Sequence, residues 1–328
     1  GFWETKEESI YVSDQIENLI KSNIKLSEIS ILFRISAHTR SFEERFINLG
    51  LPYKIIGGLR FYERKEIKDI IAYLRLVNNF SDDLAFERII NVPKRGIGEK
   101  SLQQLHNIAR ENNLSLIGAT RYAVKTNLLS KKIQETLGWF LDMLEIWRET
   151  LSSNEKSHID LVEQVLDESG YTDMLQNEQT IESEGRLENL KELVSGMSDF
   201  YNLQDFLDHV SLVMENQVDR NSDKVSLMTL HASKGLEFKQ IYLPGWEEET
   251  FPNKKSLDDN GQKGLEEERR LAYVGITRAK LECTISSSES RYKFGDFNFN
   301  LESRFIKELP VQFVEDLTPS GFQSSNIA

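Results

Sequence analysis

The residues best suited to chemistry lie between two apolar runs near residue 230. The segment 229–238 carries His231, Lys234 and Glu237 around Gly235. Open α/β sheets bind ligands in polar loops that follow buried strands. A lysine beside an open glycine backbone suits a phosphate group, and a glutamate can accept hydrogen bonds from a ribose hydroxyl. A plain turn between two strands, with solvated charges, fits the same spacing equally well.

A second segment, 265–280, reads as a helix in which acidic residues come first and basic residues come last. That order complements the helix dipole, and Glu266 and Arg270 are spaced for an ion pair. Arg278 needs another explanation, because the small and apolar residues around it look packed. An arginine held rigidly at a packed helix end is suited to binding a phosphate in a fixed geometry.

Phe33 and Arg34 stand at the end of the first apolar run. An aromatic ring beside an arginine at a strand end can stack on a base and reach a phosphate. A core phenylalanine next to a surface arginine is the simpler explanation of this pair taken alone.

A basic, glycine-containing turn opens a further predicted helix. It contains Lys94, Arg95, Gly96 and Gly98. The Gly-Ile-Gly sequence would bring backbone N–H groups close to a phosphate at a helix N-terminus, with positive charges beside it. Such a turn holds a nucleic-acid backbone without reading its sequence. The alternative is an ordinary glycine-rich helix start with solvated lysines.

Several kinds of site are excluded by the sequence. None of the 18 glycines is followed by lysine, so the phosphate loop Gly-x-x-x-x-Gly-Lys-[Ser/Thr] cannot occur. The five histidines lack metal-ligand spacing, and the single Cys283 excludes a disulfide framework and a cysteine-based zinc cluster. No apolar run approaches the roughly 20 residues of a membrane span. We therefore expect a cytoplasmic protein without a membrane partner and without a metal site of its own.

The elements that would position these residues are of two kinds. Short apolar runs predict buried strands at both ends of the chain, at 29–33, 53–56, 225–230, 240–243 and 282–286. Between them, apolar residues recur every three or four positions, which is typical of packed helices.

This distribution predicts one discontinuous domain, because strands at the two ends need each other to form a sheet. We expect an α/β domain formed by residues 1–78 and 222–317, interrupted by an all-helical domain over residues 79–221. The small polar residues of the tail, 318–328, predict disorder.

The charge of the chain is unevenly distributed. The 328 residues include 40 Lys+Arg and 53 Asp+Glu, a net charge of −13, which would ordinarily argue against nucleic acid. Residues 142–192 alone hold fourteen acidic and four basic residues. The rest of the chain is close to neutral, so the total charge does not exclude a nucleic-acid partner.

At these segments the sequence resembles the C-terminal half of superfamily 1 DNA helicases of the UvrD/PcrA/Rep type. Segment 230–238 resembles helicase motif V, segment 266–279 resembles motif VI, and segment 32–40 resembles motif IV. Segment 57–69 and the Gly-Ile-Gly turn match two further family segments in order. The resemblance covers roughly residues 5–316. It implies a second RecA-like domain, with the parallel sheet of P-loop NTPases, split by a helical insertion.

The resemblance also implies roles at the nucleotide. Arg34 and Arg278 correspond to arginines that reach the γ-phosphate of ATP from across an interdomain cleft. Phe33 stands where the family usually has a tyrosine that stacks on adenine, and a phenylalanine ring keeps that stacking face. Glu237, with Gly235 beside it, corresponds to the residue that contacts the ribose. The phosphate loop and the Mg²⁺ ligands would belong to a first RecA-like half.

For DNA, the resemblance places Thr229 and His231 near the single strand. It places Lys94, Arg95 and the glycines Gly96 and Gly98 at the duplex. The implied function is the C-terminal half of an ATP-dependent DNA helicase or translocase. Its expected partners are single-stranded DNA, single-strand/duplex junctions, the N-terminal half of the same protein and repair proteins. The fragment alone is expected not to hydrolyse ATP.

An alternative class is a non-catalytic DNA-binding or regulatory module of a repair complex. In that case the helical domain would bind duplex DNA or a protein without any ATPase cycle. The sequence gives no nuclease motif that would favour a nuclease-associated helicase.

Overall fold

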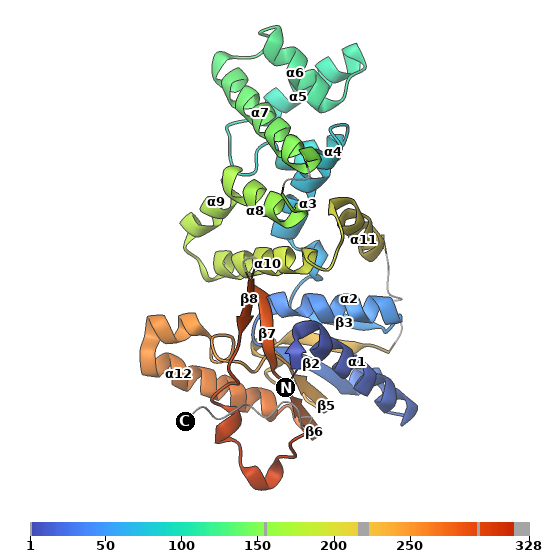
Figure 1. Cartoon of the computed structure of the whole chain (residues 1–328), viewed down its shortest axis with the longest axis vertical. Coiled ribbons are helices and arrows are strands. Elements are labelled where there is room, and N and C mark those ends of the chain that lie inside the picture. The colour runs from blue at the N-terminus through green and yellow to red at the C-terminus, as the bar shows by residue number, and fades with distance from the viewer. Residues whose placement is uncertain (1, 154–155, 216–222, 294–295, 318–328) are drawn as a thin grey trace. The chain divides into compact units, whose positions relative to one another are not determined.

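The computed structural model describes residues 2–153, 156–215, 223–293 and 296–317. The chain divides into two compact units. The first, here called the α/β unit, comprises Gly1–Phe61 and Asn216–Ala328, and the second, here called the helical unit, comprises Tyr62–Glu215. Figure 1 labels the elements of both, and each unit is described by itself.

A five-stranded, fully parallel sheet forms the centre of the α/β unit, in the order β3-β4-β2-β5-β6. Its strands are β2 (Ile29–Phe33), β3 (Tyr53–Ile56), β4 (Val225–Thr229), β5 (Phe238–Leu243) and β6 (Ala279–Ile285). Strands from both ends of the chain pair within this one sheet, with β4 lying between β3 and β2. This confirms the predicted α/β fold of RecA-like type.

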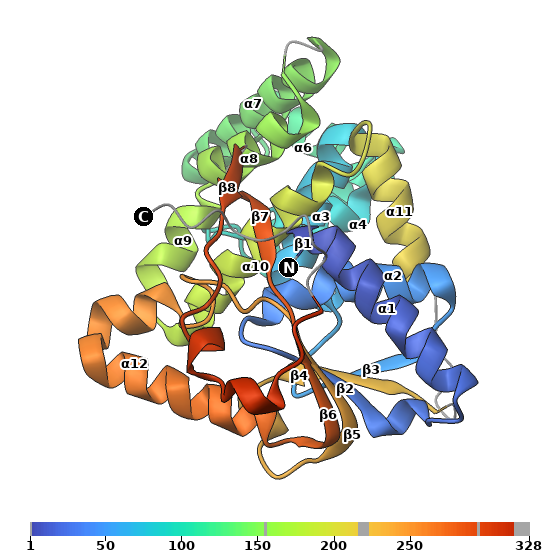
Figure 2. The same ribbon diagram turned by 60° about the horizontal axis from the view of Figure 1, so that its bottom comes forward.

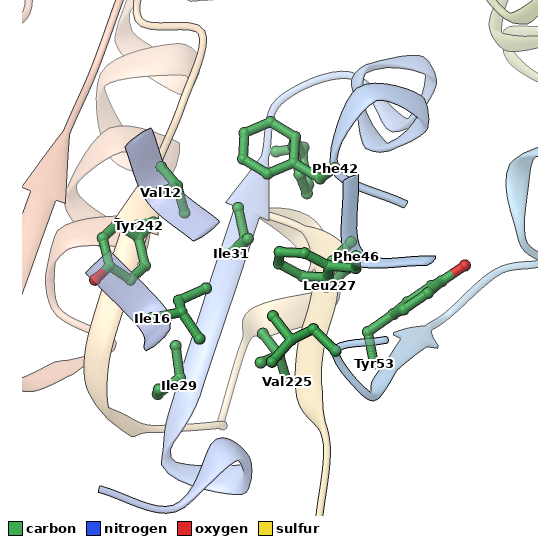
Figure 3. Packing of buried hydrophobic residues seen from close by; sticks show 12 residues of the cluster. Val12, Ile16, Ile29, Ile31, Phe42, Phe46, Tyr53, Val225, Leu227 and Tyr242 are labelled. Carbon is green, nitrogen blue, oxygen red and sulfur yellow. The ribbon is translucent and has the colours of Figure 1, made fainter. Parts of the chain in front are cut away.

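Alternate residues along each strand contribute to the hydrophobic clusters on the two faces of the sheet. Successive strand side chains point to opposite faces. In β2, Ile29, Ile31 and Phe33 therefore belong to one buried cluster, which Figure 3 shows, whereas Leu32 belongs to a second cluster with Trp246 on the other face. All five residues of β2 are buried, as expected for a central parallel strand covered on both sides.

Helices cover both faces of the sheet (Figure 2). Helices α1 (Thr5–Lys21) and α2 (Thr39–Leu49) contribute Val12 and Phe46 to the first cluster, and α12 (Lys254–Ile276) contributes Ala272 to the second. Gly275 lets α12 approach closely, because a Cβ there would lie 2.5 Å from Cδ2 of Leu230. The helix changes direction at Gly261, whose φ of 54° is non-helical.

A small second sheet and several short turns complete this unit. The sheet has the order β1-β7-β8, with β7 antiparallel to β8. Its strands are β1 (Phe2–Glu4), β7 (Ser288–Lys293) and β8 (Asp296–Phe299), and the 3₁₀ turns are η1 (Leu26–Glu28), η2 (Ser36–His38), η4 (His231–Ser233), η5 (Ile306–Glu308) and η6 (Val311–Phe313).

The helical unit consists of helices packed around aromatic residues such as Phe86, Phe140 and Trp147. Its helices are α3 (Lys65–Asn78), α4 (Asp83–Ile89), α5 (Glu99–Asn112), α6 (Leu116–Lys125), α7 (Lys131–Ser153), α8 (His158–Glu168), α9 (Tyr171–Glu178), α10 (Ile181–Met197) and α11 (Leu203–Glu215). The unit begins at Tyr62, earlier than the predicted boundary at residue 79, because α3 packs against α4, α7 and α10. The predicted tail, 318–328, lies outside the described residues.

No helix among the described residues is long and apolar enough to cross a membrane.

The single cysteine offers a test of the packing of β6. Burial, with a smaller contribution from the neighbouring Glu282, raises the pKa of the Cys283 thiol to about 12. Because only the thiolate reacts, we expect labelling by a thiol reagent at pH 8 to be at least about 100-fold slower in the folded chain than in urea. The folded-state rate should rise about tenfold per pH unit. Equal rates in the two states would contradict the packing of the partly buried Cys283 against its neighbours.

Candidate nucleotide and nucleic-acid sites

The predicted residues of the α/β unit gather at two opposite edges of the parallel sheet. Because the strands are parallel, their carboxyl ends share one edge. Arg34 directly follows β2 and His231 lies two residues after β4, so both lie at this carboxyl edge. Glu237 directly precedes β5 and Arg278 directly precedes β6, so both lie at the amino edge.

At the carboxyl edge, Arg34 is held by a buried carboxylate. Its Nε donates to Oε2 of Glu268 at 2.9 Å and its Nη2 donates to Oε1 at 2.7 Å. Oε2 of Glu268 also accepts the backbone N–H of Asn253 at 3.1 Å. The side chain of Glu268 is 4% exposed, whereas that of Arg34 is 19% exposed. Two parallel bonds fix the plane of the guanidinium.

The loop after β4 completes the carboxyl edge. Oγ1 of Thr229 accepts the N–H of Ala232 at 3.3 Å, which fixes the start of the η4 turn. Partial loss of solvent and the positive charge of Arg34 lower the pKa of His231, against the opposing effect of Glu268. The charged form of His231 is therefore disfavoured beside the fixed cation of Arg34.

At the amino edge, Arg278 is fixed by the C-terminal end of α12, which stops two residues before it, and by the loop that precedes β5. Its Nε donates to the carbonyl of Val274 at 3.0 Å, and its Nη1 donates to the carbonyl of Leu236 at 3.2 Å. Glu237 is exposed and lies 3.5 Å from Nζ of Lys280. The preceding Gly235 has a φ of +85°, which favours glycine. The structure thus brings Gly235, Glu237 and Arg278 together.

The structure does not bring Arg34 and Arg278 together. The six residues of β5 separate the two edges, roughly 20 Å at 3.3 Å per residue. The partner of Arg34, Glu268, lies ten residues before Arg278, about 15 Å at the rise of a helix. Arg34 and Arg278 thus lie at different edges of the sheet, and the expectation that both reach one phosphate stays a prediction that this placement does not support.

Phe33 lies in the interior of the α/β unit. Its ring is 1% exposed and packs edge to face on Phe42, with 5.1 Å between the ring centroids. The alternation of β2 turns this ring toward α1 and α2. No ring face is open to a base in this arrangement, so the adenine-stacking role stays a prediction that the geometry does not support.

The basic turn of the helical unit contains one free and one fully engaged cation. Lys94 is exposed and makes no hydrogen bond or ion pair with the residues that the structure describes. Gly96 has a φ of +76°, and Gly98 begins α5 without a side-chain cap. Exposed first-turn amides of a helix are suited to an anion.

Arg95, by contrast, points into the helical unit. Its Nη1 donates to the carbonyls of Ile89, Ile90 and Val92 at 2.9, 3.3 and 3.2 Å. Its Nη2 donates to the hydroxyl of Tyr73 at 2.6 Å and to the carbonyl of Ser169 at 3.2 Å. These contacts make Arg95 the anchor of the turn rather than a free phosphate ligand.

The sequence did not predict the structural roles of two residues, Glu268 and Asn91. Glu268 was one of several acids at a helix start, and nothing in the spacing distinguishes it from Glu267. Asn91 was part of the loop, yet its Oδ1 accepts the N–H of Arg95 at 2.8 Å and shapes the turn. An asparagine four residues before Arg95, just ahead of the glycine-containing turn, is the only local signal in the sequence for that role.

The residues at the amino edge fit part of a nucleotide. A fixed guanidinium suits a phosphate, and an exposed glutamate suits ribose hydroxyls. Within the described residues there is no group of three or more His, Cys, Asp or Glu side chains that could hold a metal ion.

Comparison with known proteins points to one family. The family model described as UvrD-like helicase C-terminal domain matches residues 1–290. A "Probable DNA helicase II homolog" of Rickettsia conorii is 48% identical over 311 residues, which cover 94% of this chain and 47% of that protein. The ATP-dependent DNA helicase PcrA of Bacillus subtilis is 43% identical over 306 residues, covering 89% and 41%. The DNA helicase II of Haemophilus influenzae is 40% identical over 325 residues, covering 96% and 44%. The chain spans about half the length of these relatives.

Proposed function

Because the chain belongs to the UvrD-like helicase C-terminal domain family, we propose that it is the C-terminal half of an ATP-dependent DNA helicase or translocase. The observation that carries the proposal is the separation of two polar edges on one RecA-like sheet. One edge has the groups for a nucleotide and the other has the groups for a nucleic-acid backbone. A motor that couples ATP hydrolysis to movement along DNA needs a nucleotide site and a nucleic-acid site on the same rigid domain.

At the amino edge, we assign Arg278 to the terminal phosphate of ATP and Glu237 to the ribose, with Gly235 allowing close approach. A guanidinium fixed in advance stabilises charge that develops on the phosphoryl oxygens at little reorganisation cost. ATP supplies the free energy of the cycle, and its Mg²⁺ would be held by the N-terminal half of the protein. This chain contributes the opposite wall of the site.

At the carboxyl edge, we assign Arg34, Thr229 and His231 to the single strand. This differs from the γ-phosphate role that the sequence suggested for Arg34, and it follows from the position of Arg34 beside Thr229 and His231. In the helical unit, Lys94 and the amides that follow Gly98 are assigned to duplex phosphates. The expected substrate is a single-strand/duplex junction, met in the cytoplasm during repair.

The proposal is tested by comparing this chain with the full-length protein. We expect no DNA-stimulated ATP hydrolysis by the 328-residue chain, because it has no Gly-Lys dipeptide and therefore no phosphate loop. The full-length protein should hydrolyse ATP when single-stranded DNA is present. Phosphate release by the purified chain that survives Arg278→Ala would show an independent ATP site and would contradict the proposal.

Binding without hydrolysis in the full-length protein would instead favour the non-catalytic DNA-binding module. Fluorescence anisotropy with a labelled junction, measured beside the ATPase assay, separates these two outcomes.

A further inference from the structure

We propose that Glu268 is the positioning residue for Arg34, and that it holds one edge of the guanidinium so that the other edge faces a phosphate of single-stranded DNA. The inference rests on the proposed DNA role of the carboxyl edge. It adds a residue from the neighbouring helix, which touches no substrate itself.

The geometry of the pair divides the guanidinium into a held edge and a free edge. Nε and Nη2 of Arg34 are bound to the two carboxylate oxygens of Glu268. Nη1 donates to no residue that the structure describes. Because a guanidinium is planar, fixing one edge also fixes the direction of the remaining donors. A lysine has no second edge and could not perform both tasks.

Glu268 is itself immobilised. It is almost fully buried, and its Oε2 accepts a second bond from the backbone of Asn253. Its helix is packed on the sheet through Ala272 and Gly275. A buried carboxylate is costly unless it is paired. The pairing with Arg34 therefore stabilises both charges. Because Glu268 is itself fixed by the fold, the pair also fixes the orientation of the Arg34 guanidinium.

The neighbouring acid provides a matched control. Glu267 is on the same helix turn, but its side chain is 71% exposed and pairs with exposed Arg270 at 2.9 Å. Simple electrostatics predicts that removal of either negative charge strengthens DNA binding. A positioning role predicts the opposite sign for Glu268 alone, and this difference in sign is the basis of the test.

The test measures binding of a labelled single-stranded oligonucleotide to the 328-residue chain by fluorescence anisotropy over a series of salt concentrations. We expect Arg34→Gln and Glu268→Gln each to weaken binding about tenfold, with a salt slope lower by about 0.7, the loss of one single-strand phosphate contact. The double variant should bind no more weakly than either single variant, because both remove the same contact. Glu267→Gln should bind as well as the parent or better.

Circular dichroism and urea unfolding identify variants that fail to fold. If Glu268→Gln does not fold, Glu268→Asp keeps the charge but draws the carboxylate back, and it should weaken binding by an intermediate factor. Unchanged binding in Glu268→Asp would then overturn the inference.

The outcomes separate the inference from its premise. If Arg34→Gln weakens binding but Glu268→Gln strengthens it, or if their effects multiply, Glu268 does not position Arg34 and the DNA role stands. If the parent chain does not bind, or Arg34→Gln has no effect, the DNA role of the carboxyl edge is wrong and the inference falls with it.

Discussion

Replacing Arg278 by lysine is expected to lower the DNA-stimulated kcat for ATP hydrolysis of the full-length protein by about a thousandfold. Arginines that stabilise the charge of phosphoryl transfer contribute about 10³–10⁵ in rate. Lysine keeps the charge, but it has no planar fork to hold the carbonyls of Val274 and Leu236 while contacting a phosphate. Steady-state kinetics with saturating single-stranded DNA would measure the effect.

Arg270 provides the control for this substitution. It lies on α12, whose C-terminal end fixes Arg278, and its side chain is 76% exposed and pairs only with Glu267 among the contacts described. Arg270→Lys should leave kcat within about twofold, since exposed ion pairs contribute little. A similar loss in both variants would indicate general damage to α12, and an active Arg278→Lys protein would remove Arg278 from the nucleotide site.

The second large effect is expected in the helical unit, where neighbouring cations should behave in opposite ways. Arg95→Met should lower the free energy of unfolding by about 3 kcal/mol or more, because it leaves several interior carbonyls without a donor. Lys94→Gln should not change stability. It should instead weaken junction binding and lower the salt slope by about 0.9, as for one lost duplex phosphate contact.

Urea unfolding and salt-dependent anisotropy of the two variants distinguish these roles. If Arg95→Met stays as stable as the parent but loses salt dependence, Arg95 contacts DNA and the anchoring role is wrong. If Lys94→Gln leaves the salt slope unchanged, the turn does not bind a phosphate through Lys94.

The architecture of the sheet could be predicted from the sequence because buried parallel strands are continuous apolar runs. The runs at 29–33 and 53–56 coincide with β2 and β3, and the run at 225–230 extends β4 by one residue. The sheet of β1, β7 and β8 was not predicted, since Ser288–Lys293 is polar and has no apolar alternation. The helical unit begins earlier than the predicted boundary at residue 79. The helical pattern of α3 would be the same in either unit, and only its packing against other helices shows that it belongs to the helical unit.

The candidate sites could be predicted only in part. Residue types and order identified Arg34, Arg278, Lys94 and Arg95 as cations with possible tasks, but spacing cannot say where a side chain points. Arg95 and Lys94 are adjacent, yet one is engaged by interior carbonyls and the other is exposed. Pairings such as Arg34 with Glu268, which are 234 positions apart, arise from the fold and leave no local pattern.

The straight part of α12 after Gly261 carries both Glu268 and the turn that fixes Arg278. If ligands at the two edges bias this one helix, their affinities are thermodynamically linked, and the linkage is reciprocal. We therefore expect single-stranded DNA to change the affinity for a nucleotide by the same factor by which the nucleotide changes the affinity for DNA. The part of α12 after Gly261 would then determine how strongly nucleotide binding and DNA binding affect each other.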